Sequence, residues 1–460
     1  MEQPKPSLQI LELCKICPSP SPSPSAEFSL PLTFFDLPFI TIPPTERLLF
    51  YSLPAAADAP SHTSDSILQK LKNSLSLTLS HFFPLAGNVV LPEDSPEPFI
   101  LYKPGDSVSL TVAQADAADF HHLSSDEIRK ANESHFLVPQ FETSDTTCVA
   151  PILSLQITLF PGVGFCIGIA TNHMAVDGKT STTFLRSWAS ICTHESSESH
   201  LPPLDFDRTA LKDPDGLHKL YLKYRDIFLF HLRNLGQTFR LAPKKAVPDD
   251  VAGGTFELTR ADIDNLRTAA GSRRRLSTFV LTYAHVSTCV VKAQRMDPKS
   301  KVALLFPVDW RPRLGGSLVG ANYFGNGVGP CGLILEAGEL LGENGMGLVS
   351  NKLSDLIVAM DEKVKMNEIV EFMDDFYVRF FGAMPIAKTM TVAGSPRFGI
   401  YDIDFGWGRC RKVEITSMTT GETFSMGESR NGNGGVEVGI ALPRDDMNLF
   451  SSLFFERLKL

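Results

Sequence analysis

The first strong hydrophobic pattern lies at residues 64–83, where apolar residues recur at the spacing of an α-helix. The apolar positions are Ile67, Leu68, Leu71, Leu75, Leu79 and Phe82. Residues three and four positions apart share one helix face, so the stretch predicts an amphipathic helix. Ser64 or Asp65 can cap its start, and the Pro84-Leu85-Ala86-Gly87 sequence stops it.

Two continuous apolar runs predict adjacent buried strands at residues 154–160 and 164–171, separated by Pro161 and Gly162. A helix is expected at 180–192, because its apolar residues again fall on one face. The turn between the second strand and this helix reads His173-Met174-Ala175-Val176-Asp177-Gly178.

A second set of elements follows a polar stretch at 195–216. The predicted elements are a helical crossover segment at 217–240, a strand at 255–258, a helix whose capping box is Thr259 and Asp262, a helix at 278–293 capped by Ser277, a strand at 302–308, and a hairpin joining 423–426 to 436–442. The alternation of helices and strands predicts a mixed α/β protein.

Composition and charge narrow the class of protein. With 43 Lys plus Arg against 52 Asp plus Glu, the net charge is −9, which argues against a nucleic-acid or anionic-membrane partner. No run of 18 apolar residues or signal-peptide pattern is visible, so a cytoplasmic protein is expected. The eight cysteines are scattered, and Cys14-x-x-Cys17 lacks further ligands nearby, so neither a disulfide framework nor a metal site is expected. Phe outnumbers Tyr and Trp, 32 to 8 and 3, which indicates apolar interiors or pockets.

The sequence lacks the motifs of several enzyme classes. The chain has no P-loop and no Gly-x-Ser-x-Gly nucleophile elbow. Gly327-Val328-Gly329-Pro330-Cys331-Gly332 fits a dinucleotide fingerprint by letter, but no amphipathic helix follows it, so loop glycines are expected there.

Histidine is then the best candidate catalyst, in the pattern His-x-x-x-Asp. The pattern occurs at His122–Asp126 and at His173–Asp177. His122 lies among polar residues that predict the exposed start of a helix. His173 ends a buried strand, where a rigid sheet can hold a general base at the edge of a cleft.

A family resemblance rests on two motifs in a fixed order. His173-x-x-x-Asp177-Gly178 together with Asp404-Phe405-Gly406-Trp407-Gly408 resembles the BAHD acyltransferases of plants, which transfer acyl groups from coenzyme A thioesters. The stretches 30–36, 83–88 and 308–311 agree with that family. Asn322-Tyr323-Phe324-Gly325-Asn326 resembles its anthocyanin and phenolic glucoside malonyltransferase branch, although Gly327 replaces the usual Cys and Cys410 the usual Pro.

The resemblance implies an α/β fold of two similar-sized, chloramphenicol-acetyltransferase-like mixed-sheet domains with the active-site channel at their interface. The expected divisions are residues 1–205, a crossover at 206–250, and residues 251–460. A monomer without metal is expected, with acyl-CoA as co-substrate and a glycoside as acceptor.

The resemblance also assigns the site residues. His173 is the general base of a direct transfer, and Asp404 is counted with it as catalytic, although such Asp404–Gly408 segments are set back from the chemistry. Asp177 is expected to pair with Arg311. The other expected supports of the site are Gly178, Gly406, Trp407 and Gly408. The expected acyl-CoA-binding residues are Lys179, Thr180, Ser277, Thr278 and Asn326.

A malonyl donor carries a carboxylate that needs a cation. Lys179 is the first candidate, followed by Arg47 and Arg186. Aromatic residues available for the acceptor pocket are Phe34, Phe35, Phe39 and Phe405. Two alternatives stay open: the same chemistry with acetyl-CoA or hydroxycinnamoyl-CoA, and a non-catalytic scaffold or regulatory relative.

Overall fold

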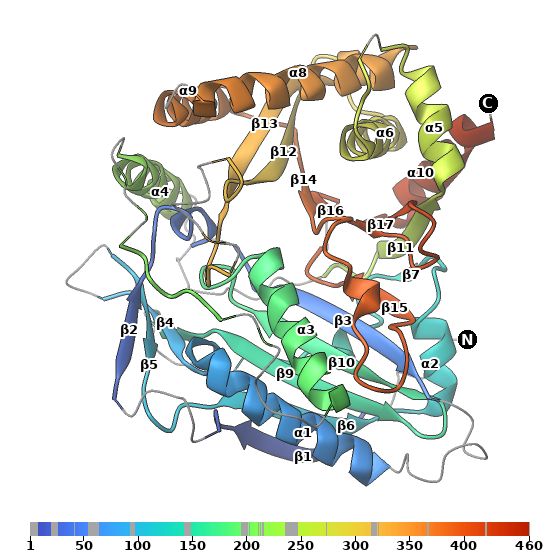
Figure 1. Ribbon diagram of the computed structural model, residues 1–460. Coiled ribbons are helices and arrows are strands. Elements are labelled where there is room, and N and C mark those ends of the chain that lie inside the picture. The colour runs from blue at the N-terminus through green and yellow to red at the C-terminus, as the bar shows by residue number, and fades with distance from the viewer. Residues whose placement is uncertain are drawn as a thin grey trace.

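A computed structural model describes residues 8–19, 26–40, 42–53, 64–92, 97–141, 149–194, 201, 203–209, 211, 213, 216–234, 247–272, 274–313, 320, 322–365, 368–418 and 421–459. These residues form sheets and helices arranged as two halves, one above the other in Figure 1. No helix in these ranges is long and apolar enough to cross a membrane. The mixed α/β class expected from the alternation of elements is confirmed.

The first half is built on a sheet with the strand order β1-β6-β9-β10-β3-β15. Its strands are β1 Gln9–Ile16, β3 Thr45–Ser52, β6 Val108–Gln114, β9 Leu153–Phe160, β10 Gly164–Thr171 and β15 Lys412–Ile415. The predicted apolar strands are confirmed as β9 and β10, which pair antiparallel and are buried throughout. Helices α1 (Ser64–His81) and α3 (Gly178–His194) cover one face (Figure 1). The Trp188 indole N–H of α3 donates to the Leu71 carbonyl of α1 at 3.1 Å.

The second half is built on a sheet with the strand order β13-β12-β14-β16-β17-β11-β7. Its strands are β7 Arg129–Lys130, β11 Val251–Leu258, β12 Lys301–Asp309, β13 Val328–Glu336, β14 Lys388–Ala393, β16 Thr423–Glu428 and β17 Val436–Pro443. Its helices are α5 Arg260–Ala269, α6 Thr278–Ala293, α7 Ala337–Leu341, α8 Gly345–Lys365, α9 Ile369–Gly382 and α10 Arg444–Glu456. The predicted capping box of Thr259 and Asp262 and the Ser277 cap are both present.

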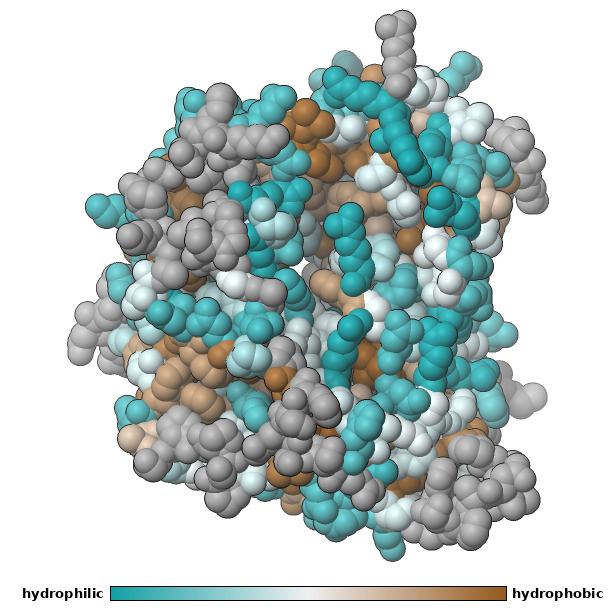
Figure 2. Space-filling model, in the orientation of Figure 1, coloured by the Kyte–Doolittle hydropathy of each residue, from teal (hydrophilic) through white to brown (hydrophobic). Residues whose placement is uncertain are grey.

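The remaining elements lie around these two sheets. A small sheet has the order β2-β5-β4-β8, with bounds β2 Phe28–Pro31, β4 Asn88–Val90, β5 Phe99–Tyr102 and β8 Val149–Pro151. The short helix α2 spans Ala117–Leu123, and α4 spans Leu217–Asn234 in the crossover. The end of the predicted crossover helix, 235–240, lies outside the described residues. Polar residues are spread over the face in Figure 2, with apolar residues visible between them in several separate areas.

The glycines at 327–332 were expected in a loop; this is correct for Gly327 and wrong for Gly329 and Gly332. Residues from Val328 onward form β13, which pairs antiparallel with β12. Glycine is needed there for close packing: a Cβ on Gly329 would lie 2.4 Å from the Trp310 indole nitrogen, and one on Gly332 would lie 2.4 Å from the Leu304 carbonyl oxygen.

Each sheet contains a strand from the other half of the sequence. β15, from the second half, pairs with β3 at the edge of the first sheet. β7, from the first half, pairs with β11 at the edge of the second. The domain boundaries at 205 and 250 stay a prediction. A division of the chain at two positions cannot describe the exchange of β7 and β15 between the two sheets.

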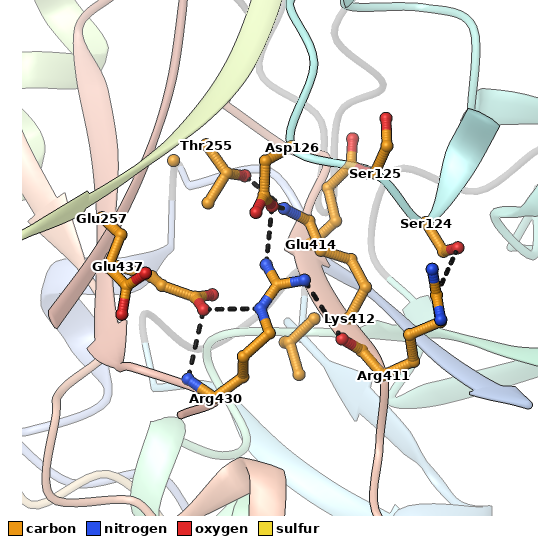
Figure 3. A network of polar contacts seen from close by, with 12 residues as sticks. Ser124, Ser125, Asp126, Thr255, Glu257, Arg411, Lys412, Glu414, Arg430 and Glu437 are labelled. Carbon is orange, nitrogen blue, oxygen red and sulfur yellow. Dashed lines mark hydrogen bonds and ion pairs between the residues drawn. The ribbon is translucent and has the colours of Figure 1, made fainter. Parts of the chain in front are cut away.

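A polar network surrounds the exchanged strands (Figure 3). Lys412 of β15 is buried, and its ammonium group contacts Asp126 and donates to the Thr255 hydroxyl at 2.6 Å. Arg430 lies 2.6 Å from the same Asp126 carboxylate and 2.8 Å from Glu437. Asp126 precedes β7, Thr255 lies in β11, and Glu437 lies in β17, so the network joins the two sheets.

We predict that Lys412→Ala lowers the free energy of unfolding by about 2 kcal/mol. The substitution leaves the Thr255 hydroxyl without its ammonium donor. Asp126 is half-exposed and still pairs with Arg430, so the loss of stability should be smaller than for a fully buried ion pair. Urea denaturation measures the change. The control is Arg409→Ala, whose partner Asp402 is exposed and whose effect should stay below about 1 kcal/mol. Equal effects of the two substitutions would contradict a supporting role for Lys412.

Candidate active site

His173 lies two residues beyond the end of β10, at the entrance to α3. Its imidazole stacks on the Phe39 ring, with centroids 3.9 Å apart and planes 6° from parallel. Burial lowers the pKa of His173 below its ordinary value of 6.5, so the ring is neutral at pH 7. The Nδ1 atom is buried without a hydrogen-bonding partner. A neutral imidazole held by stacking can accept a proton from a hydroxyl group.

Asp177 does not hydrogen-bond to the His173 ring; its carboxylate holds the turn and the loop opposite. One oxygen accepts the Thr180 N–H at 2.9 Å. The other accepts the Gly327 N–H at 3.0 Å and lies 2.8 Å from the Arg311 guanidinium, so the predicted ion pair is present. Burial alone would raise the pKa of Asp177, but the attraction of Arg311 holds it below its ordinary value.

Asn326 fixes the backbone that carries His173. It is fully buried, and its side-chain amide donates to the carbonyl oxygens of His173 at 2.9 Å and Met174 at 3.2 Å, and to the Asp36 carboxylate at 2.8 Å. Its expected role was acyl-CoA binding, but these contacts leave no exposed surface for a ligand. Asn326 is a positioning residue in this structure.

Asp36 is a second buried carboxylate, joined to the His173 turn through the Asn326 side chain. It accepts hydrogen bonds from the Thr33 N–H and hydroxyl, at 2.7 and 2.9 Å, and lies 2.8 Å from the guanidinium of Arg208 in the crossover. The Tyr323 ring lies between two guanidinium groups, 5.6 Å from Arg208 and 5.9 Å from Arg311. Segment 323–327 is thus held between the two ion pairs.

Asp404 lies far from His173. Its side chain accepts the N–H groups of Gly406 at 2.7 Å and Gly408 at 2.9 Å, and its carbonyl accepts the Thr193 hydroxyl at 2.9 Å. Thr193 is fifteen residues beyond Gly178 on α3, about 22 Å along the axis at 1.5 Å per residue. Gly406 and Gly408 have φ values of +99° and +101°, which only glycine adopts readily. The turn therefore needs its glycines, and Asp404 caps it.

The aromatic residues of the same motif pack into the first half. Phe405 is buried, with its ring centroid 5.6 Å from that of Tyr51 and 5.0 Å from that of Trp188. Trp407 packs edge-on against Phe165 at 5.5 Å. Phe405 therefore lies in the core, not in an acceptor pocket.

The expected coenzyme residues fall at two helix starts. Thr180, in the first turn of α3, is buried and donates its hydroxyl to the Gly325 carbonyl at 2.8 Å. Lys179 beside it is half-buried. Ser277 accepts the Val280 N–H as the cap of α6, and Thr278 is the first residue of that helix. Among the described residues, no contact joins the start of α3 to the start of α6.

Comparison with known proteins identifies the family. The chain matches the Transferase family over residues 10–456, and it is 37% identical to phenolic glucoside malonyltransferase 1 of Arabidopsis thaliana, with 100% of this chain and 99% of that protein covered. The chain belongs to this family, the BAHD acyltransferases. It is also 38% identical to malonyl-CoA:anthocyanidin 5-O-glucoside-6''-O-malonyltransferase of the same plant, covering 97% and 98% of the two chains.

Solved structures agree with a BAHD fold. Vinorine synthase superposes with a TM-score of 0.72 at 19% identity, over 98% of each chain. Fusarium sporotrichioides TRI101 in complex with coenzyme A and T-2 superposes with a TM-score of 0.65 at 16% identity, over 92% of this chain and 97% of that one. This BAHD protein is therefore an acyltransferase that uses acyl-CoA as co-substrate. The described residues contain no group of His, Cys, Asp and Glu arranged to hold a metal ion.

Sequence reasoning missed Asp36, Arg208 and Tyr323. A signal existed for two of them, because Asp36 ends one stretch that agrees with BAHD enzymes and Tyr323 lies in another. Arg208 lies in a polar stretch without periodicity, so nothing distinguished it. The other His-x-x-x-Asp pair is separated: His122 lies near the end of α2 rather than the start of a helix, 3.0 Å from Glu133, and Asp126 joins the network of Figure 3.

We predict that Asp177→Asn chiefly lowers stability, by about 3 kcal/mol, because it leaves the buried Arg311 guanidinium with only the partly exposed Asp309, 3.3 Å away, as a counter-charge. Thermal and urea unfolding of wild type and variant measure the loss. A pure rate defect in a fully stable protein would contradict this assignment.

Proposed function

We propose that this enzyme transfers a malonyl group from malonyl-CoA to a sugar hydroxyl of phenolic, flavonoid or anthocyanin glucosides. The observation that carries the proposal is full-length identity of 37–38% to relatives named as malonyltransferases of such glucosides. The neutral, half-buried His173 supplies the base that the reaction needs. The protein acts as a cytoplasmic monomer in this proposal.

In the proposed reaction, acyl transfer is direct. The His173 imidazole takes the proton of the acceptor hydroxyl as its oxygen attacks the thioester carbonyl. The tetrahedral intermediate collapses, the carbon–sulfur bond breaks, and the imidazolium returns the proton to the departing thiolate. Stacking on Phe39 and the Asn326 bonds to the backbone keep the ring in place through both steps. No acyl-enzyme forms.

The coenzyme is proposed to lie near two helix starts. A helix N-terminus presents free N–H groups and partial positive charge, which suit phosphate groups. Ser277 and Thr278 offer such a start at α6. At the start of α3 the Asp177 carboxylate already accepts the Thr180 N–H, so the ammonium group of Lys179 would supply the positive charge beside His173. Thr180 would act mainly through its hold on the Gly325 carbonyl. Asp404 and its loop would act at a distance, by supporting α3.

Two relatives favour a hydroxycinnamoyl group as the second candidate acyl donor. Agmatine coumaroyltransferase of Arabidopsis thaliana is 34% identical over 98% of this chain, and an anthocyanidin coumaroyltransferase is 31% identical over the same share. A hydroxycinnamoyl donor is therefore the alternative to malonyl.

We predict malonyl transfer at the highest kcat/KM when purified enzyme is given malonyl-, acetyl- and p-coumaroyl-CoA with a phenyl or flavonol glucoside. Product formation by liquid chromatography measures each rate. Malonyl transfer no faster than acetyl transfer would overturn the donor assignment, and no transfer from any donor would favour a scaffold role.

We predict that His173→Ala lowers kcat about 10²–10⁴-fold while the protein stays folded, the usual loss for a general base. In wild type, burial lowers the pKa of His173 below 6.5, so kcat/KM should hold down to that value and fall at lower pH as the ring is protonated. The variant should lack this acid limb. Wild-type turnover in folded variant would mean a structural histidine.

A further inference from the structure

Arg47 of β3 is a buried cation whose donors are not used by the described protein. It is 8% exposed, and no ion pair or hydrogen bond joins its guanidinium to any described residue. Burial lowers the pKa of Arg47 to about 10, which leaves it charged at neutral pH. A buried guanidinium has five N–H donors to satisfy, so an arginine in this state normally has a partner.

Arg47 lines two neighbouring cavities. The larger, of about 90 Å³, lies between the sheets and is also lined by Phe398, Tyr401 and Glu428. The smaller, of about 20 Å³, is also lined by Val176, Thr180 and Ser181. A water molecule needs about 10–15 Å³ by this measure, so the larger cavity has room for a group of several heavy atoms.

The smaller cavity borders the His173 turn, and the larger one reaches the same region through Phe398. Arg47 pairs in register with Ile169 of β10, four residues before His173 and on the order of 13 Å along an extended strand. Val176 belongs to the same turn as His173. Phe398 packs on the start of α3, where a Cβ on Gly178 would lie 2.7 Å from its ring. A ligand group held by Arg47 would therefore lie beside the catalytic turn.

The charges around the larger cavity leave Arg47 available. Glu414 pairs with Arg129, and Glu437 is bound by Arg430 and by the Tyr401 hydroxyl. One oxygen of Glu428 accepts the Tyr401 N–H at 3.1 Å, and the other has no partner. Glu428 attracts Arg47 but is too far away to form an ion pair, so it does not occupy the donors.

The two other candidate cations are placed differently. Arg186 is exposed and donates to the carbonyls of Phe398 and Gly399 at 2.6 and 3.2 Å, so its donors are in use. Lys179 is half-buried on α3 and offers a point charge. A carboxylate matches the fork of a guanidinium in bidentate geometry, which an ammonium cannot offer.

We propose that Arg47 receives the terminal carboxylate of the malonyl group and so selects dicarboxylic acyl donors. This inference rests on the proposed function. An acetyl group ends in a methyl, which would leave the guanidinium unpaired in the cavity. A site built to hydrogen-bond a substrate group discriminates strongly against an analogue that lacks it.

The test is donor preference in Arg47→Met, which keeps most of the side-chain length and removes the charge. The ratio of kcat/KM for malonyl-CoA to that for acetyl-CoA should fall about 10- to 100-fold, with most of the change in KM for malonyl-CoA. Arg47→Lys should recover part of the ratio. The matched control is Arg186→Met, which should keep the wild-type ratio. Circular dichroism and thermal unfolding establish that each variant is folded.

Calorimetric titration of malonyl-CoA and acetyl-CoA keeps the inference testable without turnover. Weaker binding of malonyl-CoA alone in Arg47→Met supports the inference. A wild-type donor ratio in folded Arg47→Met overturns it, as does loss of the ratio in Lys179→Met instead. A wild type that prefers acetyl-CoA would refute the proposed donor itself, and is seen before any variant is made.

Discussion

Two buried carboxylates, Asp36 and Asp177, impose the constraint on which the site depends. A carboxylate removed from water is unfavourable unless a cation and hydrogen-bond donors surround it. The cations here come from distant parts of the chain, Arg208 in the crossover and Arg311 after β12. Segment 323–327 lies between the pairs, through the Tyr323 ring, the Asn326 amide and the Gly327 N–H. The first half can therefore bury its carboxylates only when the second half is in place.

This arrangement leaves the His173 ring without an acidic partner. In a Ser-His-Asp triad, a carboxylate orients the imidazole and stabilises its charged form. Here Asp177 is committed to Arg311 and to two backbone N–H groups, and the orientation of His173 comes from Phe39 and from the Asn326 bonds to the backbone. Without a direct carboxylate contact, burial dominates and the pKa falls. The ring is therefore neutral at pH 7, which is the form that the proposed general-base role needs.

Local patterns in the sequence predicted the elements well, and long-range contacts poorly. The apolar periodicity of α1, the two apolar strands and the Thr259 capping box depend on neighbouring residues, so they could be predicted. The glycines of β13 could not, because their reason is the close approach of Trp310 and Leu304. Likewise Asn326 was assigned to the coenzyme because a motif gives no direction for a side chain. Arg208 could not be predicted from the sequence, because its role is the ion pair with Asp36, which lies far away in the chain.

The two motifs of the family act on one helix. Asp177 precedes the first turn of α3, and the carbonyl of Asp404 accepts the Thr193 hydroxyl in its last turn. Between them, Arg186 of the helix donates to Phe398 and Gly399, so segment 398–408 follows α3 from start to end. The chain then continues into β15, which pairs with β3 (Figure 1). The Asp404–Gly408 motif therefore holds the far end of the helix whose start shapes the His173 turn, about 22 Å along the axis from Gly178 to Thr193.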